Sequence, residues 1–253
     1  MRLGVCTSVS YADLMAKIGF EFIEVGASGI AAMTDEEFAA LCAENEKAPI
    51  HAESANVLFP GTIHLTGPEV NMEEVEAYIE KVLFRLSTLG VEVAVFGSSG
   101  SRKVPEGFPV EEAWQQMITA GKLLAEKAEK YGMIIALEPL RSAETNMITK
   151  QAEGLKLVQE VNHPRFKLLC DYFHLAAEGG TPEDVEVCGD TLVHIHVANP
   201  VTRKAMHPED GADYASFFAA LRKAGYNGRI SFEGACEDYA SELPGALEVM
   251  KQA

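Results

Sequence analysis

Short apolar segments alternate with amphipathic segments along the whole chain. Eight short, largely apolar segments predict strands, at residues 2–6, 21–25, 49–54, 91–96, 134–138, 166–171, 192–196 and 230–233. The segments between them have helix-capping residues or apolar positions at the helical spacing, and they predict helices at 12–18, after Thr34, after Asn71, at 110–131, at 151–162, after Thr181, at 213–224 and around 247–250. This regular order is typical of a parallel sheet covered by helices.

The number of these units indicates how the sheet closes. Eight strand–helix units in 253 residues match the (β/α)8 TIM barrel, an α/β fold whose active sites lie at the C-terminal ends of the strands. No Gly/Ser-rich linker or change of composition divides the chain. We therefore predict a single domain over residues 1–253.

Four consecutive predicted strands end on residues that bind hard metal ions or move protons. In chain order they are Glu138, Asp171, His196 and Glu233. Because the carboxyl ends of barrel strands meet at one mouth, we expect these side chains to converge there. His194 shares the strand face of His196 but lies farther from the strand end, so we expect it to be a hydrogen-bonded group deeper in the barrel.

Three carboxylates and one imidazole make a mainly oxygen donor set. Such a set suits Mn²⁺, Mg²⁺ or Co²⁺ better than an ion that prefers thiolates. The five cysteines are scattered singly and indicate neither a disulfide framework nor a thiolate zinc site. Because three carboxylates repel one another without a cation, we predict one divalent metal ion, with Mn²⁺ favoured and Mg²⁺, Co²⁺ or Zn²⁺ as alternatives.

These strand-end residues also have structural interpretations. A glutamate in such a position, as at Glu138 or Glu233, is often a helix N-cap or half of an ion pair. Glu24, His51 and Glu53 are also expected at strand ends, but they share no pattern with partners. For these three we favour structural or supporting roles.

The segment 97–102, with the sequence Gly-Ser-Ser-Gly-Ser-Arg, follows another predicted strand. Its backbone N–H groups and Arg102 can hold a polar or anionic group of a substrate. An ordinary Gly/Ser turn is the alternative, because no predicted helix starts directly behind the segment. His174, just beyond Asp171, is likewise either a group of the mouth or a satisfied interior histidine.

The net charge of −17 and the sequence pI near 4.8 bear on the partners of the chain. An acidic surface repels polyanions, so we expect neither nucleic acid nor an anionic membrane as a partner. The sequence has no signal-peptide pattern and no apolar run of membrane-spanning length, and we expect a cytoplasmic protein. The long loop segments are compatible with a homo-oligomer.

Several segments of the chain carry a family resemblance. They are Leu-Glu-Pro-Leu at 137–140, Cys-Asp-Tyr-Phe-His at 170–174, His-Ile-His at 194–196 and Ser-Phe-Glu-Gly at 231–234. With the segments 56–61 and 96–102, they resemble the xylose-isomerase-like TIM-barrel sugar (phosphate) isomerases and epimerases over nearly the whole chain. That superfamily includes the D-tagatose and D-psicose 3-epimerases.

The resemblance implies a role for individual residues. The implied metal ligands are Glu138, Asp171, His196 and Glu233, and the implied acid/base pair is Glu138 and Glu233. The implied contacts to substrate hydroxyl groups are Glu144, His174 and Arg203. The implied substrate is a small-molecule sugar or sugar phosphate.

Together these features predict a divalent-metal-dependent sugar isomerase or epimerase. A divalent ion that chelates a sugar carbonyl and the adjacent hydroxyl stabilises the enediolate formed when a neighbouring carbon loses its proton. Two carboxylates on opposite sides then invert that carbon, whereas one base that serves neighbouring carbons gives an aldose–ketose isomer. The sequence does not choose between these outcomes or identify the sugar.

Three other functions compete with this prediction. A metal-dependent dehydratase (lyase) acting on a polyol or keto acid uses the same enediolate. A DNA-repair endonuclease-like hydrolase needs several zinc ions and a basic groove, against which the seven histidines and the acidic charge argue. A non-catalytic sugar-binding protein does not need the two proposed acid/base carboxylates.

Overall fold

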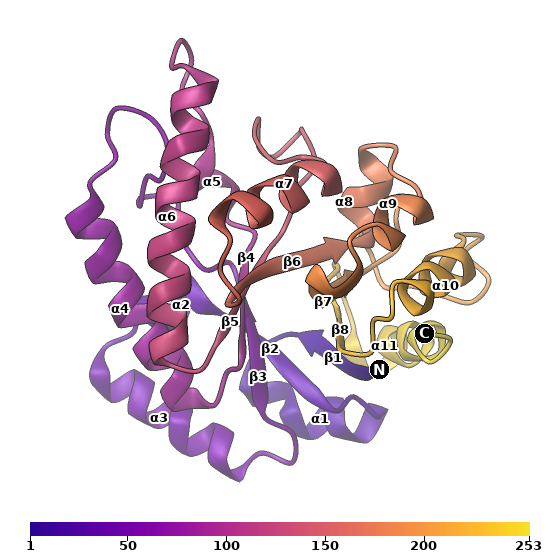
Figure 1. Cartoon of the computed structure of the whole chain (residues 1–253). Coiled ribbons are helices and arrows are strands. Elements are labelled where there is room, and N and C mark those ends of the chain that lie inside the picture. The colour runs from indigo at the N-terminus through magenta and orange to yellow at the C-terminus, as the bar shows by residue number, and fades with distance from the viewer.

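Eight parallel strands form a closed barrel in the computed structural model, which describes residues 1–253 (Figure 1). The strands are β1 (Arg2–Cys6), β2 (Phe22–Gly26), β3 (Ala52–Asn56), β4 (Val93–Phe96), β5 (Ile134–Leu137), β6 (Phe166–Asp171), β7 (Leu192–Val197) and β8 (Arg229–Phe232). Each strand pairs with its neighbour in the chain, and β1 closes the barrel against β8. The predicted TIM-barrel fold is confirmed.

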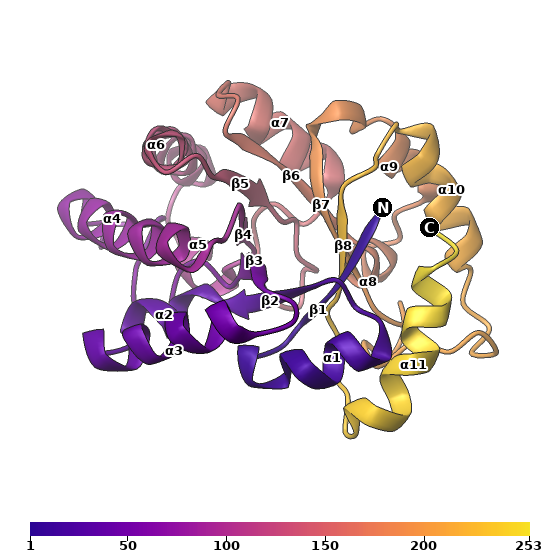
Figure 2. The ribbon, with the colours of Figure 1, turned by 90° about the horizontal axis from the view of Figure 1, so that it is seen from below.

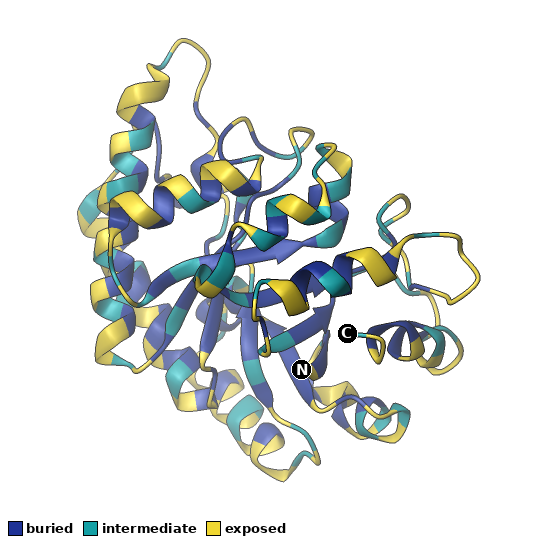
Figure 3. Cartoon of the chain, turned by 45° about the vertical axis from the view of Figure 1, so that its right-hand side comes forward, coloured by how far each residue is buried: buried dark blue, intermediate teal, exposed yellow.

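Helices surround this barrel on its outer side (Figure 2). The α-helices are α1 (Ala12–Ile18), α2 (Ala27–Ala32), α3 (Asp35–Lys47), α4 (Met72–Leu89), α5 (Ser99–Arg102), α6 (Val110–Lys130), α7 (Gln151–Val161), α8 (Tyr172–Ala177), α9 (Pro182–Glu186), α10 (Tyr214–Lys223) and α11 (Tyr239–Met250), with short 3-10 helices η1 (Val9–Tyr11) and η2 (Gly189–Thr191). Their outward faces are exposed and the strands are buried (Figure 3). No helix is both long and apolar enough to cross a membrane.

Helix α4 shows how the sequence sets these elements. The side chain of Asn71 accepts hydrogen bonds from the backbone N–H groups of Glu73 and Glu74, which satisfies donors that the first turn leaves free. The buried stripe repeats at the helical spacing and consists of Val75, Ile79, Val82, Leu83, Leu86 and Leu89. Gly90 ends the helix at a φ of 96°, a left-handed conformation that glycine adopts without a Cβ clash.

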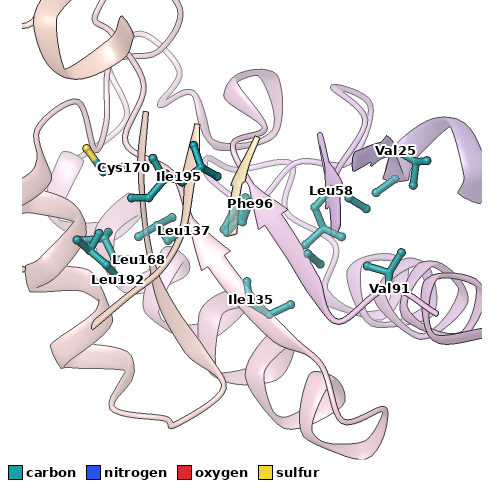
Figure 4. Close-up of a cluster of buried hydrophobic side chains, with 14 of the residues drawn as sticks. Val25, Leu58, Val91, Phe96, Ile135, Leu137, Leu168, Cys170, Leu192 and Ile195 are labelled. Carbon is teal, nitrogen blue, oxygen red and sulfur yellow. The ribbon is translucent and has the colours of Figure 1, made fainter. Parts of the chain in front are cut away.

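The hydrophobic core occupies the layer between the strands and the helices. Alternate residues of β5, Ile135 and Leu137, point into this layer with Leu168 and Ile195 of neighbouring strands (Figure 4). Ala136, between them, belongs to a separate small apolar cluster, as expected for the inner face of the barrel. The next residue of the same parity as Ala136 is Glu138, so the period-two pattern directs its carboxylate inward.

One predicted strand is displaced from its observed position. The strand expected at 49–54 is observed at Ala52–Asn56, because the side chain of Asn45 accepts a hydrogen bond from Ala52 N at 2.9 Å and fixes the start of β3 there. The expectation that His51 and Glu53 end a strand is therefore wrong. Glu53 accepts hydrogen bonds from Arg2 and Arg229 near the N-terminal ends of their strands, which supports a structural role.

Candidate metal and catalytic site

Four side chains meet at the C-terminal mouth of the barrel, where strands β5 to β8 end. They are Glu138, Asp171, His196 and Glu233, and one potential ligand atom of each lies within 4.8 Å of those of the others. The His196 Nδ1 atom lies 3.1 Å from Glu138 Oε1 and 3.2 Å from Glu233 Oε2. The structure thus brings together the four residues that the strand ends indicated.

The hydrogen bonding of Asp171 tests whether a cation fits this cluster. Its Oδ1 accepts a hydrogen bond from Phe173 N at 2.7 Å, whereas its Oδ2 is buried and has no hydrogen-bond partner. Leaving a buried acceptor unsatisfied costs about 1–3 kcal/mol, and more when the group is charged. The cluster offers three carboxylates and one imidazole, and one of its carboxylate oxygens, Asp171 Oδ2, is free. This donor set fits a divalent ion that prefers oxygen ligands.

The carboxylates perturb one another strongly in the absence of a cation. Burial, followed by the charges of Glu138 and Glu233, raises the pKa of Asp171 to about 7. Burial and the charge of Glu233 also raise the pKa of Glu138. For Glu233, burial raises the pKa, but the charges of His196 and Arg203 outweigh it and lower the pKa to about 2. The cluster therefore resists carrying three negative charges at once, and a divalent cation removes that resistance.

Glu24 of β2 lies directly behind His196. Its Oε1 lies 2.8 Å from His196 Nε2, and its Oε2 lies 2.6 Å from His194 Nε2. Ser54 and Ser231 donate hydroxyl hydrogen bonds to the same Oε2 at 2.9 and 2.5 Å. A carboxylate on one ring nitrogen of a histidine fixes its orientation and leaves the other nitrogen free for a metal. Glu24 therefore turns His196 Nδ1 toward the mouth.

This arrangement bears on two expectations from the sequence. His194 is fully buried and hydrogen-bonded to Glu24, which confirms its position deep in the barrel. Glu24 was expected to have a structural or supporting role, but its bonds to both histidines were not foreseen. The signal in the sequence was a single carboxylate inside an otherwise apolar strand, because a buried charge needs partners.

Arg203 and Glu144 lie at the rim of the cluster. Arg203 Nη2 donates to Glu233 Oε2 at 2.9 Å, and Arg203 Nη1 donates to Glu144 Oε1 at 3.5 Å. Arg203 has a φ of 53°, which is uncommon for a residue with a side chain and occurs mainly where surrounding contacts hold it. The two residues thus lie beside the clustered carboxylates, and their contact with a substrate remains a prediction.

His174 lies beside Asp171, with its Nε2 buried and without a hydrogen-bond partner. Its Nδ1 accepts a long hydrogen bond of 3.3 Å from Arg141 N. Burial, followed by the charge of Arg203, lowers the pKa of His174 to about 3, so the imidazole is neutral at pH 7. The free Nε2 does not match a fully satisfied interior histidine and leaves this nitrogen available to a ligand.

The family model of the xylose isomerase-like TIM barrel matches residues 12–253. The chain belongs to this family. An L-ribulose 3-epimerase from Methylomonas sp. is 35% identical over 127 residues, which cover 50% of the chain and 42% of that relative. A D-psicose 3-epimerase from Ruminiclostridium cellulolyticum is 26% identical over 236 residues, covering 88% of the chain and 76% of the relative.

A solved structure agrees with the fold of this family. The 3-keto-D-glucoside 4-epimerase from E. coli superposes with a TM-score of 0.84 at 17% sequence identity, and the match covers 100% of both chains. At this identity the likeness concerns the fold alone. The match extends over the whole (β/α)8 barrel, including the strands that carry the four clustered residues.

Arg102 differs from what the sequence suggested in this member of the xylose isomerase-like family. Its side chain is fully buried, and its guanidinium donates to the backbone oxygens of Glu138 at 2.6 Å and Phe96 at 3.3 Å. A short helix, α5, contains it, where a Gly/Ser turn was the favoured alternative. Because protein atoms cover Arg102 completely, the expected contact between Arg102 and a substrate does not agree with its position.

Asn56, at the end of β3, is a site residue that sequence reasoning missed. Its Nδ2 donates to Glu233 Oε1 at 2.8 Å, so Asn56 and Arg203 hold the two oxygens of Glu233. Asn56 also lines a cavity of about 350 Å³ between β1, β2 and α2, together with Cys6, Val9, Glu24, Ile30 and Met33. This cavity adjoins the cluster through Glu24 and Asn56 and has no lysine or arginine in its wall.

Proposed function

We propose that this protein is a divalent-metal-dependent sugar epimerase that inverts a carbon next to a carbonyl group. The observation that carries the proposal is the pair of carboxylates, Glu138 after β5 and Glu233 after β8, whose oxygens lie 3.1 and 3.2 Å from His196 Nδ1. The names of the relatives, which are 3- and 4-epimerases of ketoses and keto-sugars, support the same class of reaction.

The four clustered residues, Glu138, Asp171, His196 and Glu233, would hold the ion. A bound divalent ion supplies Lewis-acid chemistry, because it polarises a sugar carbonyl and stabilises the negative charge that develops when a neighbouring carbon loses its proton. We propose Mn²⁺, since three of the four ligands are carboxylates and no thiolate is among them.

The two glutamates are held in different ways, which suits them to opposite halves of a proton exchange. Asn56 and Arg203 donate to Glu233 and favour its ionised form, so Glu233 is prepared to remove a proton. The carboxylate of Glu138 has no such donors and its one hydrogen-bond contact is with His196 Nδ1, at 3.1 Å, so Glu138 is the member of the pair that would return a proton. Removal from one face and return to the other inverts the carbon between them.

Rim residues and the adjoining cavity would hold the rest of the sugar. His174 Nε2, Glu144 and Arg203 offer hydrogen bonds to hydroxyl groups near the reacting carbon. The cavity beside Asn56 combines apolar walls with the Thr7 and Ser8 side chains, and Glu24 is its single charged residue. An uncharged sugar end fits such a wall better than a phosphate, which needs cationic or N–H donors.

A metal-reconstitution assay tests this proposal. Protein freed of metal with EDTA is supplied separately with Mn²⁺, Mg²⁺, Co²⁺ and Zn²⁺, and each form is offered a panel of ketoses, 3-keto-glucosides and sugar phosphates in heavy water. The proposal predicts a metal-dependent epimer that carries solvent deuterium at the inverted carbon. A deoxy product would indicate a dehydratase instead, and activity unaffected by metal removal would refute the metal-dependent mechanism.

A further inference from the structure

The segment that joins β4 to α5 packs directly against Glu138. An ideal Cβ atom at Gly97 would lie 1.8 Å from Glu138 Oε2 and 2.9 Å from its Cδ. The carboxylate therefore occupies the space that a side chain at position 97 would take. Glycine is required there by the closeness of Glu138 and not by the backbone conformation, because the φ of Gly97 is not positive.

The same segment of the chain also holds the peptide groups of Glu138 by hydrogen bonds. Its backbone N–H donates to Phe96 O at 3.1 Å, and its carbonyl accepts a hydrogen bond from Arg102 Nη2 at 2.6 Å. Arg102 Nη1 donates to the same Phe96 oxygen at 3.3 Å, which ties the two peptide groups together. Both the direction of the side chain and the space for its carboxylate thus depend on the segment 96–102.

Arg102 is buried in a way that is energetically unfavourable, which space filling alone does not explain. Its side chain has no exposed surface, its hydrogen bonds go to carbonyl oxygens rather than to a carboxylate, and its Nε has no partner. A buried charge without a close counter-ion is strongly unfavourable, and apolar replacements of buried ions are often neutral or stabilising. A role in supporting the neighbouring carboxylate cluster explains why a charged residue is kept at this buried position, because Arg102 binds the backbone of Glu138.

We propose that Gly97 and Arg102 are positioning residues that set the place of the Glu138 carboxylate for metal binding and proton transfer. Gly97 provides the space for the carboxylate, and Arg102 fixes the peptide that carries it. This proposal rests on the proposed function for the presence of a metal ion at the cluster and for the role of Glu138 in proton transfer. Its consequence for metal binding is independent of which sugar the protein uses.

The variant Gly97→Ala tests the first half of the proposal. The added Cβ displaces the mobile end of the Glu138 side chain rather than backbone, so the barrel should fold normally. Gly61→Ala is the matched control, because an ideal Cβ at Gly61 meets no atom within 4 Å. Isothermal titration of Mn²⁺ into the metal-free proteins should show an affinity ~10–100-fold lower for Gly97→Ala, with Gly61→Ala unchanged.

Two variants of Arg102 test the second half. Arg102→Met removes the charge and both hydrogen bonds at similar length, whereas Arg102→Lys keeps the charge and one donor. We expect Arg102→Met to lower Mn²⁺ affinity, and to lower kcat by ~100-fold with KM nearly unchanged, because Glu138 is misplaced. Arg102→Lys should recover part of both losses, which a role in stability alone does not predict.

The outcomes separate this proposal from the proposed function. Wild-type affinity for Mn²⁺ in Gly97→Ala would overturn it, as would Arg102→Met protein that unfolds at lower temperature but keeps full affinity and kcat once folded. If Arg102→Met does not fold, Gly97→Ala alone decides the result. If the wild-type protein binds Mn²⁺ but epimerises no sugar, the proposed function fails while the metal-affinity comparison still stands.

Discussion

Replacement of Glu24 by glutamine probes how the metal site is oriented. Glu24 accepts hydrogen bonds from His196 on one oxygen and from His194, Ser54 and Ser231 on the other. Glutamine offers one oxygen and one NH₂ group, so its NH₂ group must face either His196 or the group of three donors formed by His194, Ser54 and Ser231. If the NH₂ group faces His196, the ring proton moves to Nδ1, the nitrogen that a metal needs.

The size of the effect follows from this geometry. Losing a partner that orients a metal-binding histidine typically lowers metal affinity by ~10–100-fold, which is about 1.4–2.7 kcal/mol. If the NH₂ group instead faces the other set, unsatisfied groups lower the free energy of unfolding by about 1–3 kcal/mol. Titration calorimetry of Mn²⁺ into metal-free Glu24→Gln measures the first effect, and thermal unfolding in EDTA measures the second.

Glu53→Gln is the matched control for this prediction. Glu53 is likewise a carboxylate that accepts hydrogen bonds from two side chains, Arg2 and Arg229, but near the opposite end of the barrel. This variant should lower stability while Mn²⁺ affinity stays at the wild-type value. Equal losses of affinity in Glu24→Gln and Glu53→Gln, or no loss in Glu24→Gln with stability intact, would refute the orientation of His196 by Glu24.

Three further predictions follow from the site. Glu138→Gln and Glu233→Gln keep an oxygen ligand but remove the base, so kcat should fall by ~10²–10⁴-fold and deuterium uptake from heavy water should fall with it; full activity in both variants would exclude their acid/base role. Asp171 has a pKa of about 7 without metal, and the charges of Glu233 and Glu24 raise the pKa of His196 despite its burial, so both groups must lose a proton to bind a cation. Mn²⁺ affinity should therefore decline as pH falls below 7, by up to about tenfold per pH unit for each proton released, and a flat affinity from about pH 8 to 6 would contradict this. Gly29 lines the cavity beside Asn56 and an ideal Cβ there meets no atom within 4 Å, so Gly29→Leu should raise KM for the sugar and leave Mn²⁺ affinity unchanged. Ala32→Leu, at an exposed position of the same helix that does not line the cavity, should alter neither, and an unchanged KM in Gly29→Leu would show that the sugar does not enter the cavity.

The period of the strand sequences determined much of the fold and of the candidate site. Apolar segments of short length separated by helical segments predicted the order of eight strands, because each parallel strand is buried on both faces. In the later strands, alternation also set which residues face inward. Leu169 lies in the inner apolar cluster, Asp171 follows at the same parity, and His194 and His196 share one face in the same way.

Tertiary structure alone decided which inward groups meet. Glu24 contacts His194 and His196, which are 170 and 172 residues away in sequence, because closure of β1 against β8 brings β2 across the barrel from β7. Asn56 reaches Glu233 for the same reason, at a separation of 177 residues. No local pattern encodes such pairs, since they depend on the register and closure of the whole sheet.

Arg102 is a residue whose environment could not be predicted from its local sequence. Its local sequence, rich in glycine and serine with one guanidinium, is that of an exposed turn able to bind a ligand. The structure instead folds the segment into α5 and directs the guanidinium into the barrel wall behind Glu138. Residue chemistry in the sequence indicated a cation and a group of carboxylates, whereas the packing of neighbouring strand ends decided that the cation binds the backbone of Glu138.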